Sequence, residues 1–375
     1  MLKMKRIKKK IKIFIIAGEV SGDVLGAKIM HKMPGVEFVG IGGQNMTKAG
    51  LKSIFPMSDL AVMGLFEVLG HVRTLTHRIK QTISAIVSEK PDVVLTIDSP
   101  GFAKSVVKGV RAKGVLPNTM FYHFVAPQVW AWGARRAQKY AKIFDKLYAF
   151  FDFEKPYFEK YGLRVVSVGH PIATGLDKYK KSVKQEKIIT FVPGSRMSEV
   201  KKLLPVFRDT VDLLIARGYT DYKFVIPTVE TTDAYISDYI KNWRYKPELV
   251  TSDERYQTYA NTYIAVVASG TVSAELAIMH IPTIVVYKMN PLTSILARML
   301  VRIKWVSLVN ILMNKTIFPE LLGKESNAKS VTNQIQKLTT PSNRAKMIAA
   351  LKKADTQWTR NGQDAVQIIA DDILV

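Results

Sequence analysis

The sequence predicts an α/β protein with two doubly wound domains that face each other across a cleft. Short β-branched runs alternate with longer amphipathic segments, which is the pattern of parallel strands joined by helices. The chain of 375 residues is long enough for two domains with separate cores. Residues 167–187, which carry glycine, proline and several lysines, form a natural linker between the halves. We therefore expect two Rossmann-like sheets and a helical C-terminus.

The order of the elements follows from the β-branched runs. The predicted strands are 11–17, 92–97, 118–123, 145–150, 164–168, 188–192, 222–226, 263–267 and 283–287. We expect helices between them, and helices without strands over residues 329–375. The predicted domains are 1–172 and 173–345, and residues 346–375 are predicted to return to the N-terminal domain or to contact a partner subunit. Because open α/β sheets bind ligands at the carboxyl ends of their strands, the chemistry should lie in the strand-to-helix turns.

The composition limits the classes of partner. Lysine and arginine exceed aspartate and glutamate by 55 minus 31, so the net charge is +24 and an anionic partner is expected: nucleic acid, an acidic membrane or a phosphorylated substrate. The chain has no cysteine, which excludes disulfides and thiolate zinc sites. Its six histidines show no H-x-x-x-H or H-E-x-x-H spacing, so we expect no metal and no other cofactor.

Two segments resemble membrane signals. The basic N-terminus precedes an apolar run, but Glu19 and Asp23 interrupt this run before a signal peptide is complete. No run of about 18 uncharged apolar residues occurs, so no transmembrane helix is expected. Residues 292–313 are apolar and basic, which fits either a helix lying on an anionic bilayer or a core helix.

The turn after the first predicted strand is rich in glycine but matches no phosphate-binding fingerprint. Gly22 and Gly26 would lie one helical turn apart and let the first helix approach the sheet closely. Ser21 is the predicted N-cap. Glu19, at the carboxyl end of the strand, lies where open α/β sheets bind ligands.

Two turns in the second half have the character of anion sites. In "FVPGSRMSEV", Gly194 and Ser195 join a strand to a helix, and Arg196 adds a forked cation suited to phosphate oxygens. In "VVASGTVSAEL", residues 269–271 (Ser-Gly-Thr) repeat this arrangement, and Glu275 follows one turn later. Together they predict a site for a nucleoside diphosphate, with a carboxylate for the ribose hydroxyls.

The first half carries the remaining candidates. Asp98 in "TIDSPGF" ends a strand and is either a general base or an ordinary turn residue. Trp130, in "APQVWAWGARR", fits either a membrane contact or a base-stacking surface. Residues 59–72 read as an apolar helix that includes Met63 and Phe66, which are either buried or exposed to acyl chains.

These turns, in this order, resemble the lipid-A-disaccharide synthases, which are glycosyltransferases of the GT-B fold. The resemblance extends from residue 17 to about residue 322. The matching stretches are AGEVSGDVLGA, VMGLFEVL, PDVVLTIDSPGF, APQVWAWGARR, FFDFEKPYF, VGHPI, PGSRMSEV, ASGTVSAEL and VSLVNILMNKTIFPELL.

The resemblance implies a reaction and a role for each half. UDP-2,3-diacylglucosamine would donate its sugar to the 6-hydroxyl of 2,3-diacylglucosamine 1-phosphate (lipid X), with inversion at the anomeric carbon, giving lipid A disaccharide 1-phosphate and UDP. Residues 1–172 would bind the acceptor and lipid, and residues 173–345 the UDP-sugar. The implied UDP-binding residues are Gly194, Ser195, Arg196, Ser269, Gly270, Thr271, Glu275 and Asn310. The implied acceptor and lipid residues are Ser21, Met63, Phe66 and Trp130, and either Asp98 or Glu19 would be the general base.

The chain also departs from the family pattern. Gly101 replaces a second acid that often follows in the Asp98 motif, Val309 replaces a usual proline, and Gly323 replaces a frequent glutamine. A role given to that second acid does not transfer to this chain.

Two other classes of function compete with the synthase. A GT-B enzyme or epimerase acting on soluble UDP-N-acetylglucosamine would keep both second-half turns but would not need the apolar helix. A nucleic-acid-binding protein would explain the charge but not the two diphosphate turns, so we expect no nucleic acid partner. The resemblance places the protein in the cytoplasm, peripherally on the anionic inner face of the bacterial inner membrane. A homodimer is compatible with the sequence.

Overall fold

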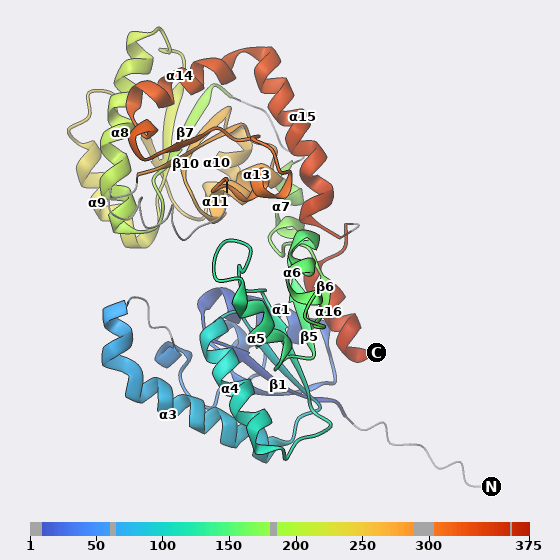
Figure 1. Ribbon diagram of the computed structural model, residues 1–375. Helices are drawn as coiled ribbons and strands as arrows, with labels where there is room; N and C mark the ends of the chain where they lie inside the picture. The colour runs from blue at the N-terminus through green and yellow to red at the C-terminus, as the bar shows by residue number, and fades with distance from the viewer. Residues whose placement is uncertain (1–9, 61–64, 181–185, 289–303, 361) are drawn as a thin grey trace. The chain divides into compact units, whose positions relative to one another are not determined.

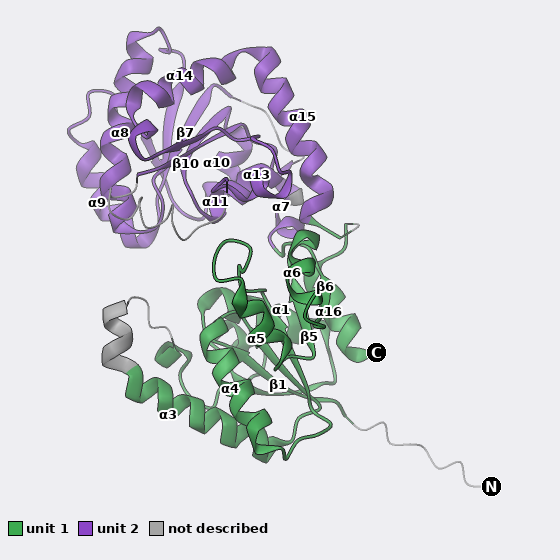
Figure 2. Cartoon of the chain, viewed as in Figure 1, with its two compact units in different colours: residues 1–171, 359–375 green, residues 172–358 purple. Residues whose placement is uncertain are grey.

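A computed structural model describes residues 10–60, 65–180, 186–288, 304–360 and 362–375; for residues 65–71 and residue 177 it describes the backbone alone. The chain divides into two compact units, shown in Figure 2. Unit 1 contains residues 1–171 and 359–375, and unit 2 contains residues 172–358.

Unit 1 is built on a parallel sheet of six strands within the described residues (Figure 1). Its order is β2-β1-β3-β4-β5-β6. The strands are β1 (Lys12–Ala17), β2 (Glu37–Ile41), β3 (Val93–Ile97), β4 (Met120–Phe124), β5 (Lys146–Ala149) and β6 (Arg164–Ser167). The helices are α1 (Val20–Lys32), α2 (Gln44–Lys48), α3 (Leu65–Glu89), α4 (Pro100–Lys113), α5 (Arg135–Ala141), α6 (Lys155–Glu159) and α16 (Ala365–Leu374). Single 3₁₀ turns are η1 (Met57–Leu60) and η2 (Asp152–Glu154).

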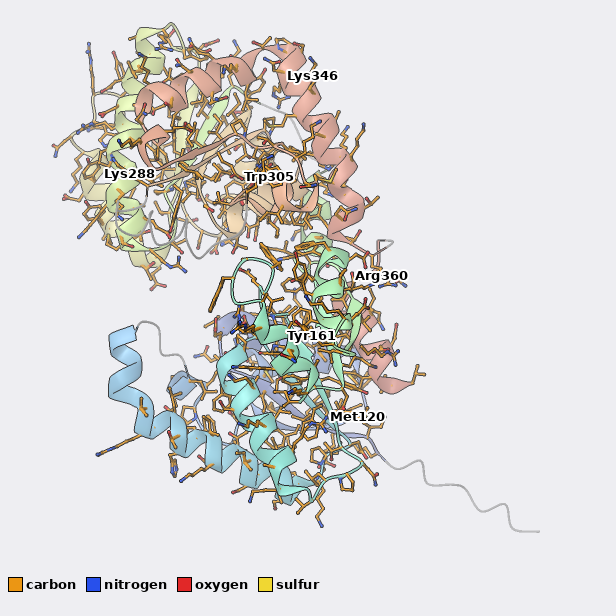
Figure 3. All side chains as sticks on the ribbon, in the orientation of Figure 1. Met120, Tyr161, Lys288, Trp305, Lys346 and Arg360 are labelled. Carbon is orange, nitrogen blue, oxygen red and sulfur yellow. The ribbon has the colours of Figure 1, made fainter. Side chains whose placement is uncertain are left out.

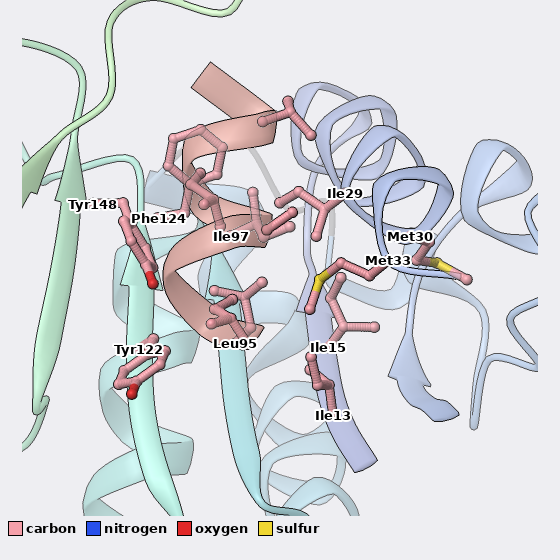
Figure 4. Packing of buried hydrophobic residues seen from close by; sticks show 14 of the residues in the cluster. Ile13, Ile15, Ile29, Met30, Met33, Leu95, Ile97, Tyr122, Phe124 and Tyr148 are labelled. Atoms are coloured by element: carbon pink, nitrogen blue, oxygen red, sulfur yellow. The ribbon is translucent and has the colours of Figure 1, made fainter. Parts of the chain in front are cut away.

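Helices cover both faces of this sheet, so its strands are apolar on both sides. Along β1, Ile13 and Ile15 pack with α1 and α16, whereas Phe14 and Ile16 pack with α3 and α4 on the other face. This alternation is the period-two pattern of a strand buried on both faces. Figure 4 shows the first of these clusters, with α16 and α1 lying over β1 and β3.

The last helix of the chain belongs to unit 1. Asp372 on α16 accepts hydrogen bonds from Lys146 Nζ and Tyr148 Oη, both at 2.7 Å, and so ties the helix to β5. The apolar side of α16 is buried in the same core as α1. Residues 346–375 are therefore not one segment: those up to Trp358 lie in unit 2, and those from Thr359 onward lie in unit 1.

Unit 2 has its own six-stranded parallel sheet among the described residues, with the order β12-β11-β10-β7-β8-β9. The strands are β7 (Ile188–Val192), β8 (Lys223–Pro227), β9 (Glu248–Val250), β10 (Ile264–Ala268), β11 (Thr283–Tyr287) and β12 (Glu320–Leu322). The longer helices are α7 (Ala173–Lys180), α8 (Met197–Ala216), α9 (Glu230–Ile240), α11 (Thr271–Ile278), α14 (Ala328–Thr339) and α15 (Pro341–Trp358). The short ones are α10 (Arg255–Asn261), α13 (Leu308–Leu312) and the 3₁₀ turn η3 (Gly323–Glu325).

The predicted fold class is confirmed, and every predicted strand is present within two residues of its predicted ends. Three strands are missing from the prediction: β2, β9 and β12. All three are edge strands, and β9 and β12 are only three residues long. None of them forms a β-branched run strong enough to predict a strand. The helices predicted for residues 329–375 are α14, α15 and α16.

Two predicted helices fall partly outside the described residues. For the segment 59–72, the structure describes η1 and a helix from Leu65 onward, while residues 61–64 are outside it. For the segment 292–313, the structure describes residues from 304 and the short helix α13. Within the described residues, no helix is long and apolar enough to cross a bilayer.

Candidate active site

The strand orders locate one candidate site in each unit. In unit 1, β1 and β3 are neighbours, and the chain leaves them toward opposite sides of the sheet. In unit 2, β7 and β10 are such a pair, because β8 and β9 extend one edge while β11 and β12 extend the other. Ligands of open α/β sheets bind at these switch points, beyond the carboxyl ends of the strands. The predicted turns after β1, β3, β7 and β10 all lie there.

Unit 2 has a cavity of about 300 Å³ at its switch point. This is the lower end of the range typical for small-molecule sites. It brings together most of the residues predicted to bind UDP: Gly194, Ser195, Arg196, Ser269, Gly270, Thr271 and Glu275. The cavity is also lined by residues that sequence reasoning missed, including Thr228, Val229, Arg255 and Tyr259. Thr228 and Val229 follow β8 in a turn without a glycine motif, and Arg255 and Tyr259 lie in α10 after β9, so no local signal marked them.

Gly194 has a conformation and surroundings that require glycine. Its φ is +102°, a value that side chains rarely adopt. A Cβ at this position would lie 2.5 Å from Glu199 Oε2. The turn therefore folds directly over the first turn of α8, and the start of that helix, at Arg196 and Glu199, lines the cavity wall.

Arg196 is the N-cap residue of α8, and its side chain is 70% exposed. Its guanidinium pairs with Glu199 Oε1 at 3.1 Å, which uses one of its five donors. The remaining donors are open to an anion in the cavity.

Glu275 is a buried acid at the cavity wall, only 6% exposed. Its Oε1 accepts a hydrogen bond from Tyr256 Oη at 3.1 Å, and Oε2 has no hydrogen-bond partner among the described residues. Burial raises the pKa of Glu275, while Arg255 and the Tyr256 hydrogen bond act in the opposite direction. A buried carboxylate oxygen that lacks a partner among the described residues is suited to accept a hydrogen bond from a ligand hydroxyl.

Asn310 has a different place from the one implied by the family resemblance. It is fully buried and is absent from the cavity lining. Its Oδ1 accepts from the amides of Ile317 and Phe318, and its Nδ2 donates to Phe318 O and Glu320 Oε1. All four hydrogen-bonding positions of the amide group are used, so Asn310 positions the chain that leads into β12.

The same loop is held by a second set of contacts. Glu320 also accepts from the amides of Val306 and Ser307, and thereby holds the residues that lead into α13. Trp305, labelled in Figure 3, donates its Nε1 to Thr316 Oγ1 at 3.0 Å. The stretch VSLVNILMNKTIFPELL, which carries the family resemblance in this region, thus forms a closed loop that leads into β12.

The switch point of unit 1 carries two acids and two hydroxyls. Asp98 follows β3 and accepts hydrogen bonds from the Ser99 amide at 2.9 Å and from Ser21 Oγ at 3.4 Å. Glu19 follows β1, and its pKa is raised by burial and by the charge of Asp98, against a hydrogen bond from Ser99. Within the described chain, neither acid forms an ion pair with a lysine or arginine. The three predicted residues Glu19, Ser21 and Asp98 are therefore neighbours, and Ser99 is a further member that the sequence did not single out.

The prediction that Ser21 caps α1 is wrong. Glu19 is the N-cap residue, in an extended conformation, and the cap has no side-chain hydrogen bond. Ser21 lies inside the first turn and turns its hydroxyl to Asp98 instead. The close packing predicted from the glycines is confirmed for Gly22, where a Cβ would lie 3.2 Å from Ile97 O of β3. Gly26 faces Met46 of α2 rather than the sheet.

The backbone of this site is strained. Asp98 and Ser99 have φ values of +56° and +44°, and Val125, after the neighbouring strand β4, has +74°. Such values are costly for residues other than glycine, most of all for a β-branched one. Strain of this kind collects at functional sites, and here it lies at the carboxyl ends of β3 and β4.

Asp23, the second acid of the first turn, has a purely structural place. Its carboxylate accepts from the amides of Gly43, Asn45 and Met46 and from the Asn45 side chain. Burial acts to raise the pKa of Asp23, but these hydrogen bonds outweigh it and lower the pKa. Of the two acids in the first turn, only Glu19 is available to a ligand.

Trp130 is half-buried and packs on Phe153 with ring centroids 5.5 Å apart. Its Nε1 donates to Glu154 Oε1 at 3.3 Å. The other oxygen of Glu154 accepts from the Phe151 amide at 3.0 Å. Burial raises the pKa of Glu154 to about 7. The other two predicted lipid residues are not placed: Met63 and the side chain of Phe66 lie outside the described residues.

Among the described residues, no group of three or more histidine and acidic side chains is arranged to hold a metal ion.

Solved structures share this architecture along nearly the whole chain. UDP-N-acetylglucosamine 2-epimerase from Neisseria meningitidis, bound to UDP-N-acetylglucosamine, aligns with a TM-score of 0.59 and 13% identity over 97% of this chain and 99% of its own. A UDP-forming trehalose-phosphate synthase from Burkholderia xenovorans aligns with a TM-score of 0.57 and 11% identity over 97% and 98%. Identities this low establish the fold alone. The protein has the GT-B fold, with a parallel sheet in each of its two units.

Sequence comparisons identify the family. The model of the lipid-A-disaccharide synthetase family matches residues 13–370. The lipid-A-disaccharide synthase of Paramagnetospirillum magneticum is 37% identical over 380 residues, covering 96% of both chains. That of Rickettsia canadensis is 38% identical over 347 residues, covering 89% of both. The chain belongs to the lipid-A-disaccharide synthase family, and it is a glycosyltransferase.

Proposed function

We propose that this protein transfers the sugar of UDP-2,3-diacylglucosamine to the 6-hydroxyl of lipid X and releases UDP. The observation that carries the proposal is the unit 2 cavity, where two glycine turns and Glu275 meet in a chain of the synthase family. The turn at Gly194–Arg196 and the start of α11 at Thr271 would bind the diphosphate through backbone N–H groups. Glu275 would accept the ribose hydroxyls.

The acceptor would be activated in unit 1. The oxygen of the acceptor 6-hydroxyl attacks the anomeric carbon of the donor, and the bond from that carbon to the UDP oxygen breaks. The hydroxyl proton passes to a carboxylate, for which Asp98 and Glu19 are the candidates. The electron pair leaves with UDP, whose developing charge would be stabilised by the N-terminus of α8 and by Arg196.

Asp98 is our choice for the base. It ends the strand at the switch point, it is held in a strained backbone, and its partners Ser21 and Ser99 leave it without a cation. The raised pKa of Glu19 makes this residue the alternative proton acceptor.

We further propose that the protein acts at the cytoplasmic face of the bacterial inner membrane, bound peripherally. The net charge of +24 favours an anionic surface and two phosphorylated lipid substrates. Met63, Phe66 and Trp130 would border the acyl chains, and a homodimer is compatible with this arrangement. Flotation with neutral and anionic liposomes tests the proposal, since binding should require anionic lipid and weaken with salt.

The reaction is tested by incubating the protein with UDP-2,3-diacylglucosamine and lipid X and weighing the lipid product. A disaccharide 1-phosphate of the summed acyl composition, formed together with UDP, is expected. In a parallel reaction with soluble UDP-N-acetylglucosamine alone, no epimer should form. Epimerisation without disaccharide would instead support the alternative of an enzyme acting on soluble UDP-sugars. The epimerase neighbours share only the fold with this chain, so they give no support to that alternative.

A further inference from the structure

At the wall of the donor cavity, a chain of hydrogen bonds connects Glu275 to two residues that lie outside the predicted motifs, Arg255 and Tyr256. Arg255 Nη2 donates to Tyr256 Oη at 3.0 Å, and Tyr256 Oη donates to Glu275 Oε1 at 3.1 Å. Arg255 and Tyr256 begin α10, whereas Glu275 lies in α11. The chain therefore links two helices across the wall of the cavity.

Arg255 and Tyr256 are each held by further contacts. The guanidinium of Arg255 lies 4.5 Å from the centre of the Tyr256 ring, and its Nη1 donates to Ser252 O at 3.4 Å. The Tyr256 ring packs on Tyr179 and Tyr259, with centroids 5.4 and 6.1 Å away. The hydroxyl of Tyr256 thus reaches Glu275 from a fixed direction.

The consequence for Glu275 is that its two oxygens differ. Oε1 is occupied by Tyr256, while Oε2 is buried and has no partner among the described residues. A buried carboxylate oxygen without a partner costs free energy unless a donor fills the place. Since Glu275 lines the cavity, a ligand can supply that donor.

We propose that Arg255 and Tyr256 are positioning residues for Glu275 and determine the selectivity of the donor site for a nucleotide with a free ribose diol. Tyr256 occupies Oε1 and fixes the orientation of the carboxylate, so that Oε2 is the oxygen left for a donor from the ligand, and the positive charge of Arg255 favours the ionised form. Without this chain, the carboxylate would rotate or take up a proton, and it would lose its advantage for a hydroxyl donor. The inference rests on the proposed function, because it takes the ligand of this cavity to be UDP.

The test compares the affinity for UDP with that for 2′,3′-dideoxy-UDP, measured by isothermal titration calorimetry on the full chain. The wild type should prefer UDP by about tenfold to hundredfold, the range of a hydrogen bond to a charged acceptor. Tyr256→Phe should bring this ratio to within about threefold of one, with little change for the dideoxy analogue. Arg255→Met should lower the ratio as well, and Arg255→Lys, which keeps a charged donor, should restore part of it.

Tyr222→Phe is the matched control, because Tyr222 precedes β8 at the opposite end of the strands and is absent from the cavity lining. It should leave the ratio unchanged. An unchanged ratio in Tyr256→Phe, with UDP still bound, would overturn the positioning role alone. A ratio near one in the wild type would overturn the placement of the ribose at Glu275. Failure of the wild type to bind UDP at all would overturn the proposed function together with this inference.

Discussion

The two candidate sites occupy equivalent places in their sheets, but they differ in their turn residues and in the partners of their acids. In unit 2, the left-handed turn residue is Gly194, and the acids that line the cavity are matched by arginines: Glu199 by Arg196, and Glu275 by Arg255 through Tyr256. In unit 1, the left-handed residues are Asp98, Ser99 and Val125, and among the described residues the acids contact hydroxyls and an amide but no cation.

The difference between the two sites reflects the different requirements of binding a diphosphate and of accepting a proton. Binding a diphosphate needs close backbone N–H groups and carboxylates whose charge does not repel the ligand, and glycine turns with paired acids meet both needs. Accepting a proton needs a carboxylate that no cation has made less basic. The switch-point site of unit 1 leaves Asp98 and Glu19 without a lysine or arginine partner among the described residues, and the backbone at Asp98 is strained. We therefore expect changes in unit 1 to affect turnover and changes in unit 2 to affect UDP affinity.

The largest effect should come from Asp98→Asn. The substitution preserves the shape and the hydrogen bond from the Ser99 amide but removes the basicity. Turnover should fall by about 10²- to 10⁴-fold, the usual contribution of a general base. UDP affinity, a property of unit 2, should stay the same. Steady-state kinetics and calorimetry on the same preparation measure both.

Glu19→Gln is the companion variant. If Asp98→Asn kept near-normal turnover and Glu19→Gln lost it, Glu19 would be the base. If Asp98→Asn also lost UDP binding, the two units would not divide the chemistry, and Asp98 would be structural.

Gly194→Ala should have the next largest effect, this time on binding. The new side chain would meet Glu199 at a φ that alanine disfavours, so the turn must move away from α8. The combined cost of strain and overlap is about 2 to 4 kcal/mol, and UDP should bind about a hundredfold more weakly.

Gly218 provides a matched control in the same unit. Its φ is +89°, but no atom lies within 4 Å of a Cβ built there. Gly218→Ala therefore introduces similar strain without a collision, and it should reduce stability slightly and leave UDP affinity intact. Equal losses of affinity in both variants would mean that strain alone, rather than the fit of the turn over α8, explains the effect.

A smaller loss of affinity is expected for Arg196→Ala. The side chain is exposed and already shares one donor with Glu199, so its contact with a phosphate is worth less than a buried one. UDP should bind about tenfold more weakly, and the dependence of affinity on salt should become shallower. Arg208→Ala, at an exposed position further along α8, should change neither quantity. Arg208→Ala with the same effect would reveal general attraction by the net charge rather than a specific contact.

The sequence predicted the sheets and most of the donor site because those features are local. Buried parallel strands are continuous apolar runs, and Gly194–Arg196 and Ser269–Thr271 each lie in one short turn. Arg255 and Tyr259 were missed because they line the cavity from a helix that follows a weak edge strand. Tyr256 was missed for the same reason, since only the fold brings its hydroxyl to Glu275. The burial of Asn310 also depends on tertiary contacts, since its four partners come from residues seven to ten positions later in the chain.

Two buried acids sharpen the comparison between the units. Glu275 in unit 2 has Arg255 nearby, which opposes the effect of burial on its pKa. Around Glu154 in unit 1, the described groups that oppose the effect of burial are the Trp130 indole and the amides of Phe150 and Phe151, and the pKa of Glu154 rises to about 7. No cation among the described residues opposes the effect of burial on Glu154, so this acid should change protonation near neutral pH.

This change should appear as a dependence of stability on pH that Glu154→Gln removes. In the unfolded chain the carboxyl is ionised above pH 4.5, its ordinary pKa, whereas in the folded protein it keeps its proton up to about pH 7. Between these values the folded state binds more protons, so the free energy of unfolding decreases as the pH rises. From pH 6 to pH 7 the decrease is about 1 kcal/mol, or roughly fivefold in the unfolding equilibrium. Urea unfolding of wild type and Glu154→Gln at both pH values isolates the contribution, because all other groups titrate in both proteins. If the two proteins lose stability in parallel, Glu154 is already ionised in the folded state, and the hydrogen bonds from Trp130 and Phe151 are strong enough to replace a cation.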